Sequence, residues 1–135
     1  MRNVKFRVVP PVPSAENFLE VNVRTYVTCN GKPGIYFFSL DASSLLAVIG
    51  ARAGAFLPYY HARMSVRKEG DEFVYCSSRN STDLHVRYGP QSTSFESNSG
   101  SLEAWLTERY CLFQDAFGGK VLSIDIHHHR WQLQK

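Results

Sequence analysis

The chain has 135 residues, of which 44% are hydrophobic and 20% charged, a size and composition typical of one globular domain. This composition excludes a disordered tail, a collagen-like fibre and a coiled coil, and the longest apolar run, residues 45–49, is far shorter than the roughly 20 residues of a membrane span. The net charge of +3 comes from basic residues scattered along the chain, so we expect no nucleic-acid partner.

The cysteines and the N-terminal segment indicate in which cellular compartment the protein is expected. Cys29, Cys76 and Cys111 lie far apart without a CxxC pair, which predicts free thiols in a reducing environment. Residues 1–13 carry charge but lack the apolar core of a signal peptide. We therefore expect a cytoplasmic protein without a membrane partner.

The N-terminal half is predicted to form two strands and a helix. The expected elements are an irregular, proline-containing lead-in at residues 1–17, strands at 19–28 and 34–40, and a helix at 42–55 with Leu45, Val48, Ile49 and Arg52 on one face. Asn30-Gly31 predicts a hairpin turn that Lys32-Pro33 lengthens. The second strand is apolar on both faces, which predicts burial on both sides. Asp41 is the expected N-cap, and the helix ends before Pro58.

The C-terminal half is predicted to consist mainly of strands with short connections. Strands are expected at residues 60–68, 72–79, 83–88, 110–114 and 121–127, a helix at 101–109, and a Ser-rich surface loop at 90–100. Ser99 or Ser101 is the expected helix cap. About seven strands and two helices, without repeats or a linker, predict one strand-dominated α+β domain with an antiparallel or mixed, barrel-like sheet.

Five segments follow one another in a recognisable order: residues 19–27 (LEVNVRTYV), 36–41 (YFFSLD), 57–64 (LPYYHARM), 106–113 (LTERYCLF), and 126–128 (IHH) with Trp131. Together they resemble the DUF2071, or YqjF-like, family, which is itself of unassigned function. This family is similar to the acetoacetate-decarboxylase-like superfamily. The resemblance implies a single domain over residues 1–135, built as an antiparallel, partly open, cone-like β-barrel around a pocket, with a helix packed outside.

The resemblance does not carry over the decarboxylase activity. The decarboxylase uses a Schiff-base lysine directly after a Gly-aromatic-Pro turn, and such a lysine reacts because its pKa is depressed. Here Tyr59 and Tyr60 follow Pro58, so we expect no imine chemistry. A pocket glutamate of the decarboxylase matches Glu20. The chain looks shortened at both ends relative to the family, and the open strand edges of an incomplete barrel would invite pairing with a second copy.

The first candidate site lies on the strand at residues 19–28. Glu20, Asn22 and Arg24 share one face over about 13 Å, and the opposite, Val-rich face is expected to pack on the helix at 42–55. The resemblance favours a pocket lining over a solvent-facing polar stripe, with Arg24 binding a ligand carboxylate and Glu20 exchanging a proton. Because positions i and i+4 are too distant for direct contact, the pair would be coupled through Asn22, water or ligand.

The second candidate site follows Pro58. Tyr59, His61 and Arg63 share a strand face, where His61 would act as an acid–base group and Arg63 would bind an anion, although a half-exposed surface strand explains them equally well. Tyr36 and Phe38 are the aromatic residues expected to line the same pocket.

A third set, Asp125, His127 and His129, suggests a metal site. The first and last members lie about 13 Å apart on a strand, so the three cannot bind one ion, and no HExxH motif or cysteine cluster supplies further ligands. We expect neither a metal nor another cofactor.

Two functions remain open. In the first, the protein holds a small anionic, partly apolar molecule in a pocket, with or without catalysis. In the second, it is a non-catalytic structural or interaction protein whose truncated barrel self-associates. A closed cavity containing Glu20 and Arg24 would favour the first, and an open sheet with both side chains in solvent would favour the second.

Overall fold

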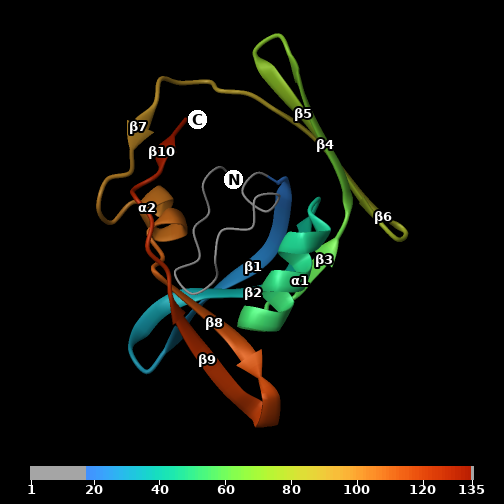
Figure 1. Cartoon of the computed structure of the whole chain (residues 1–135). Coiled ribbons are helices and arrows are strands. Elements are labelled where there is room, and N and C mark those ends of the chain that lie inside the picture. Colours follow the sequence, from blue (N-terminus) through green and yellow to red (C-terminus); the bar gives the residue numbers. More distant parts are fainter. Residues whose placement is uncertain (1–17, 135) are drawn as a thin grey trace. The chain divides into compact units, whose positions relative to one another are not determined.

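The computed structural model describes residues 18–134, and the expected lead-in at residues 1–17 lies outside them (Figure 1). The strands are β1 (Glu20–Cys29), β2 (Lys32–Ala42), β3 (Tyr59–His61), β4 (Arg63–Glu69), β5 (Glu72–Arg79), β6 (Thr82–Tyr88), β7 (Phe95–Glu96), β8 (Cys111–Ala116), β9 (Lys120–Asp125) and β10 (Gln132–Leu133). The helices are α1 (Leu45–Ala55), α2 (Leu102–Thr107) and the 3-10 turn η1 (Phe117–Gly119).

The strands form three sheets. One has the order β1-β2-β8-β9 with β3 beside β2, the second has the order β4-β5-β6, and the third pairs β7 with β10. The second and third sheets are antiparallel, as is the β8–β9 pair, whereas β2 runs parallel to both β3 and β8. The predicted strand-dominated α+β fold is confirmed, with a mixed first sheet. Within residues 18–134 the strand pairings close no barrel, which agrees with a partly open one.

The chain divides into two compact units. Among residues 18–134, the first unit contains the chain up to Val23 together with Phe37–Tyr88, and the second contains Arg24–Tyr36 together with the chain from Gly89 onward. The predicted single domain stays a prediction. Each side-chain cluster of the candidate sites lies within one unit.

The β1–β2 hairpin is determined locally. Asn30 and Gly31 have φ values of 51° and 77°, which are left-handed conformations that Asn tolerates and Gly adopts freely. Two such residues complete the turn, and β2 begins at Lys32. The expectation that Lys32-Pro33 lengthens the loop is therefore wrong.

Strand β2 supplies much of the core. Ile35, Phe37, Leu40 and Ala42 are all buried. The side chain of Phe38 is 59% exposed, so the prediction of burial on both sides of this strand fails at that position. A β-strand alternates its side chains between two faces, and here the face of Phe38 is incompletely covered.

Helix α1 begins three residues later than expected, and its N-cap is Ser44, not Asp41. The Ser44 hydroxyl accepts a hydrogen bond from the Ala47 amide at 3.3 Å, while the Asp41 carboxylate pairs with Arg79. The helix ends at Ala55, before Pro58, as expected. Phe56 follows in a left-handed conformation, and its amide bonds the Ala51 carbonyl.

The predicted inward face of α1 is only partly correct. Val48 is buried, but Leu45 and Ile49 are each 56% exposed. Val23, on the face of β1 that was expected to pack on this helix, is also exposed. The apolar spacing predicted a shared face, but of its three apolar residues only Val48 is buried.

The remaining predicted elements occur in the predicted order, and their bounds shift by at most two residues. The strand expected at residues 60–68 is divided into β3 and β4 at Ala62, whose amide bonds the Ala42 carbonyl. The loop expected at 90–100 contains the short strand β7. Ser101 caps α2 by accepting from the Ala104 amide at 3.2 Å, which selects it over Ser99. Among the described residues, no helix has both the length and the apolarity to cross a membrane.

Candidate functional site

The side chain of Glu20 forms a hydrogen-bonded group in the first unit, which we call the Glu20 site. The Tyr59 hydroxyl donates to Glu20 Oε2 at 2.6 Å, and Asn22 Nδ2 donates to Oε1 at 3.4 Å. The Tyr75 hydroxyl donates to the Glu20 backbone carbonyl at 2.9 Å. The carboxylate therefore has a phenol and an amide as neighbours.

Local structure places these groups together. Tyr59 begins β3 directly after Pro58 and lies opposite Leu40 of β2 in a parallel pair. The start of β1 is bound to the end of β2, because the Leu19 amide donates to the Ser43 hydroxyl and the Ser43 amide donates to the Leu19 carbonyl. These two contacts bring Glu20 to the Tyr59 phenol.

Tyr59 is the most buried member of the Glu20 site, with 6% of its surface exposed. Burial raises the pKa of its phenol, and the nearby Glu20 charge and hydrogen bond raise that pKa further. Tyr59 therefore remains a proton donor at ordinary pH. A carboxylate held by a buried phenol is suited to exchanging a proton with a molecule that reaches it.

The second unit contains an aromatic–arginine cluster, formed by Arg24, Tyr26, Trp105 and Arg109. The Tyr26 and Trp105 rings lie 4.3 Å apart between centroids. The Arg109 guanidinium lies 4.8 Å from the Trp105 ring and 5.7 Å from the Tyr26 ring. The Arg24 guanidinium lies 5.6 Å from the Tyr26 ring, so two cations face one phenol ring.

The end of helix α2 anchors this cluster. The Leu106 carbonyl accepts from Arg24 Nη2 at 3.4 Å and from the Tyr26 hydroxyl at 3.2 Å. Carbonyl groups of the last helical turn lack partners within the helix, so these side chains satisfy one of them. Arg109 Nε is buried and has no hydrogen-bond partner among the described residues.

The structure thus brings Asn22 and Tyr59 to Glu20, while Arg24 contacts Leu106. The proposed coupling between Glu20 and Arg24 stays a prediction. Sequence reasoning missed Trp105 and Arg109 as members of a site. Tyr26, two residues beyond Arg24 on the same strand face, is the signal that was available for the aromatic part.

The other predicted site residues belong neither to the Glu20 site nor to the aromatic–arginine cluster. The Tyr36 hydroxyl donates to Asp115 Oδ2 at 2.7 Å, and this hydrogen bond is the main cause of a raised phenol pKa. Phe38 is largely exposed, and His61 and Arg63 are exposed on β3 and β4. Their roles in binding stay predictions.

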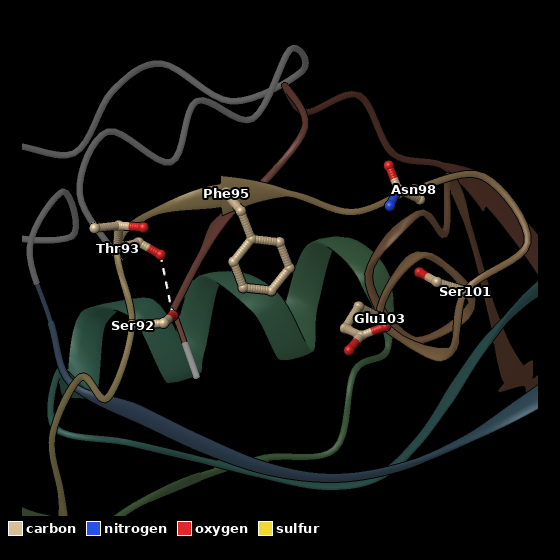
Figure 2. A pocket seen from close by; sticks show the side chains of 6 residues that line it. All are labelled: Ser92, Thr93, Phe95, Asn98, Ser101 and Glu103. Carbon is tan, nitrogen blue, oxygen red and sulfur yellow. Dashed lines mark hydrogen bonds between the residues drawn. The ribbon is translucent and has the colours of Figure 1, made fainter.

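A cavity of about 410 Å³ lies in the second unit, and none of the predicted site residues is among the described residues that line it (Figure 2). Its lining residues are Ser92, Thr93, Phe95, Asn98, Ser101 and Glu103. Figure 2 shows the Phe95 ring in the middle, with Ser92 and Thr93 on one side and Glu103 on the other. Glu103 is the one charged residue among the described residues that line it.

The third predicted set consists of Asp125, His127 and His129, and only Asp125 forms an ion pair that the structure describes. Asp125 forms an ion pair with Lys32, and the His127 and His129 rings lie 6.5 Å apart. Across residues 18–134, no three His, Cys, Asp or Glu side chains gather in a way that would hold a metal ion.

The fold resembles that of acetoacetate decarboxylase. The decarboxylase from Legionella pneumophila matches with a TM-score of 0.54 and 18% identity, over 78% of this chain and 43% of the enzyme. At that identity the likeness concerns the fold alone.

The chain belongs to the DUF2071 family, described as an uncharacterized conserved protein, whose sequence pattern matches residues 1–135. It is 47% identical over 137 residues to the uncharacterized protein YqjF of Bacillus subtilis (strain 168). The match covers 99% of this chain and 56% of YqjF, so the chain spans about half the length of the curated relative it matches.

Proposed function

We propose that this protein binds a small anionic, partly apolar molecule of the carboxylate class at the aromatic–arginine cluster. The observation that carries the proposal is the pair of guanidinium groups, from Arg24 and Arg109, over the ring of Tyr26. Planar guanidinium groups bind carboxylates through paired, charge-assisted hydrogen bonds. The rings of Tyr26 and Trp105 supply apolar surface beside them.

Two further features support binding there. Trp105 is 48% exposed, so an apolar part of a ligand has a surface to cover. Arg109 Nε has no acceptor among residues 18–134, and a buried donor without an acceptor carries a free-energy cost. A ligand that brings oxygen atoms to this guanidinium lowers that cost.

Proton transfer is a separate proposal, for a molecule that binds at the Glu20 site of the first unit. Glu20 is the group that exchanges the proton, and the buried Tyr59 holds its carboxylate in place. His61 is an alternative acid–base group on the exposed part of β3. No imine chemistry is proposed, because Tyr59 stands directly after Pro58, where a Schiff-base amine would be needed.

A non-catalytic interaction protein is the second candidate. It is favoured by the apolar side chains that α1 and the β4–β5–β6 sheet leave exposed, among them Leu45, Ile49 and Val86. This candidate does not require the aromatic–arginine cluster to bind a small molecule.

The binding proposal is tested by thermal unfolding of the full chain in the presence of aromatic and aliphatic carboxylic acids. A ligand at about a hundred times its Kd stabilises the folded state by about 2.7 kcal/mol, which raises the melting temperature measurably. We expect an acid with an aromatic or branched apolar group to give this shift. If no carboxylate raises the melting temperature, the proposal is wrong.

Three variants locate the binding site. Arg109→Met and Trp105→Leu are each expected to reduce the ligand-dependent shift, measured against the unliganded form of the same variant. Lys120→Met removes an exposed cation of the same unit outside the cluster and should leave the shift unchanged. An unchanged shift in Arg109→Met would place binding elsewhere.

A further inference from the structure

Strand β6 is an exposed edge of the three-stranded sheet in the first unit. It pairs with β5 along its whole length, and within residues 18–134 no strand pairs with its other side. All seven of its residues are exposed. An unpaired edge of this kind presents backbone donors and acceptors to another strand.

The register of the β5–β6 hairpin identifies the outward-facing peptide groups. Thr82 lies opposite Arg79 across the turn at Asn80 and Ser81. In a hairpin with a two-residue turn, the flanking residues exchange the first backbone hydrogen bonds, and the direction alternates from there. Thr82 and every second residue after it therefore direct their peptide groups towards β5. Asp83, His85 and Arg87 direct theirs towards the free edge.

The charges of β6 are complementary to those of the same strand reversed. When two copies of β6 pair antiparallel with His85 on the two-fold axis, Asp83 of each lies opposite Arg87 of the other. Opposite charges in directly facing positions stabilise an antiparallel pair, and like charges destabilise it. Both outer pairs then join opposite charges, and each Arg87 guanidinium also forms ion pairs with Glu69 and Glu72 of its own chain, at 2.7 and 2.9 Å.

The same charges disfavour the symmetric registers centred on Asp83 and on Arg87, whereas an axis through Leu84 or Val86 places His85 opposite Asp83 or Arg87. An axis through Asp83 places two carboxylates opposite each other, and an axis through Arg87 does the same with two guanidinium groups. Only the register centred on His85 places Asp83 directly opposite Arg87. Register is therefore specified by charge as well as by backbone direction.

The apolar face of the sheet fits this arrangement. Leu84, Val86 and Tyr88 are exposed on one face of β6, and the cross-strand neighbour of Val86 on β5 is Tyr75, which in turn lies opposite Val66 of β4. In the register centred on His85, Leu84 of one copy faces Val86 of the other. Pairing then extends a single apolar face across both copies.

We propose that β6 pairs antiparallel with β6 of a second copy of this chain, centred on His85, and forms a homodimer with one continuous sheet. The charge complementarity of Asp83 and Arg87 selects a second copy over other partners. The proposal concerns the first unit and does not depend on ligand binding at the aromatic–arginine cluster.

Backbone pairing is tested by the mass of the full chain in solution, measured by analytical ultracentrifugation. The unaltered chain is expected to be a dimer. His85→Pro removes an outward-facing amide and leaves the peptide groups directed towards β5 unchanged, a position where an edge strand tolerates proline. It should give a folded monomer, with circular dichroism as the check on folding, whereas His85→Val should remain a dimer. A monomeric unaltered chain, or a dimeric His85→Pro variant, would overturn the proposal.

The register is tested with charge reversals that are combined by mixing. Asp83→Lys alone and Arg87→Glu alone each place like charges opposite each other in a homodimer, so each should raise the dimer Kd by about tenfold or more. An equimolar mixture of the two variants restores attraction at both positions and should form a heterodimer. A mixture that associates no better than either variant would exclude this register.

Discussion

Tyr59 donates its hydroxyl proton to the carboxylate of Glu20 at 2.6 Å, across 39 positions of sequence. The phenol is buried, whereas Glu20 is half-buried and also accepts a hydrogen bond from the side-chain amide of Asn22. This contact joins the first residue of β1 to the first residue of β3. It positions the carboxylate that the proposed proton transfer would use.

Removing the Tyr59 hydroxyl should destabilise the fold. Tyr59→Phe leaves the ring in place but deprives Glu20 of a hydrogen bond to a charged acceptor, at a cost of about 2 kcal/mol. Urea unfolding followed by fluorescence measures the change. Tyr60→Phe, at the neighbouring exposed position, should alter stability little, because its ring still faces Arg52 and Arg79. Equal losses in both variants would contradict the role assigned to the Tyr59 hydroxyl.

The raised pKa of Tyr59 predicts a loss of stability in alkali. Its phenol ionises at about 10 in the unfolded chain and at a higher pH in the folded protein. The folded state therefore holds the proton more tightly, so this stabilisation is complete below about pH 10 and is lost as the pH rises towards the folded pKa.

Comparison with a variant isolates the contribution of Tyr59. Tyr36, Tyr75 and Tyr110 also have raised pKa values, but these tyrosines are present both in the unaltered chain and in the Tyr59→Phe variant. Unfolding measured at about pH 9 and about pH 11 should show a larger alkaline loss for the unaltered chain than for Tyr59→Phe. Identical losses would mean that Tyr59 titrates as in the unfolded chain.

Gly34 should be intolerant of a side chain. A Cβ built there lies 2.7 Å from the Cys111 carbonyl oxygen and 2.7 Å from the Phe113 ring. Gly34→Ala must therefore separate β2 from β8, and we expect a loss of about 1–3 kcal/mol in unfolding free energy. Gly50→Ala is the matched control, since its Cβ meets nothing within 4 Å and alanine favours the helix by up to about 1 kcal/mol. In thermal unfolding, Gly34→Ala should lower the melting temperature and Gly50→Ala should raise it.

The ion pair between Asp41 and Arg79 should contribute more than a surface pair. Arg79 Nε lies 2.8 Å from Asp41 Oδ1, with side-chain exposures of 28% and 16%, and its guanidinium lies 4.4 Å from the Tyr60 ring. A double-mutant cycle with Asp41→Ala and Arg79→Ala should give a coupling energy of about 1–2 kcal/mol.

An exposed pair provides the comparison for that cycle. Arg67 Nε lies 2.7 Å from Glu69 Oε1 on β4, and the two side chains are 66% and 38% exposed. Their coupling should be below about 0.5 kcal/mol and should weaken in salt. If both cycles give the same energy, burial adds nothing to the Asp41–Arg79 pair.

Sequence reasoning located the elements whose causes are local. The Asn30-Gly31 turn, the strand over Glu72–Arg79 and the Ser101 cap depend on groups within a few positions of one another. Backbone sterics, alternation and capping hydrogen bonds act over that range, so the residue types are sufficient to indicate them.

Tertiary structure decided which partner each polar group takes. Asp41 is a reasonable N-cap by sequence, but Arg79 lies close enough in space to bind its carboxylate, and Ser44 caps the helix instead. The prediction placed Arg24 in a site, yet its contacts with Leu106 and with the ring of Tyr26 depend on where α2 lies, 82 positions further along the chain for Leu106. A carboxylate or a guanidinium binds whichever partner folding brings within about 3 Å, and side-chain type and spacing do not specify that proximity.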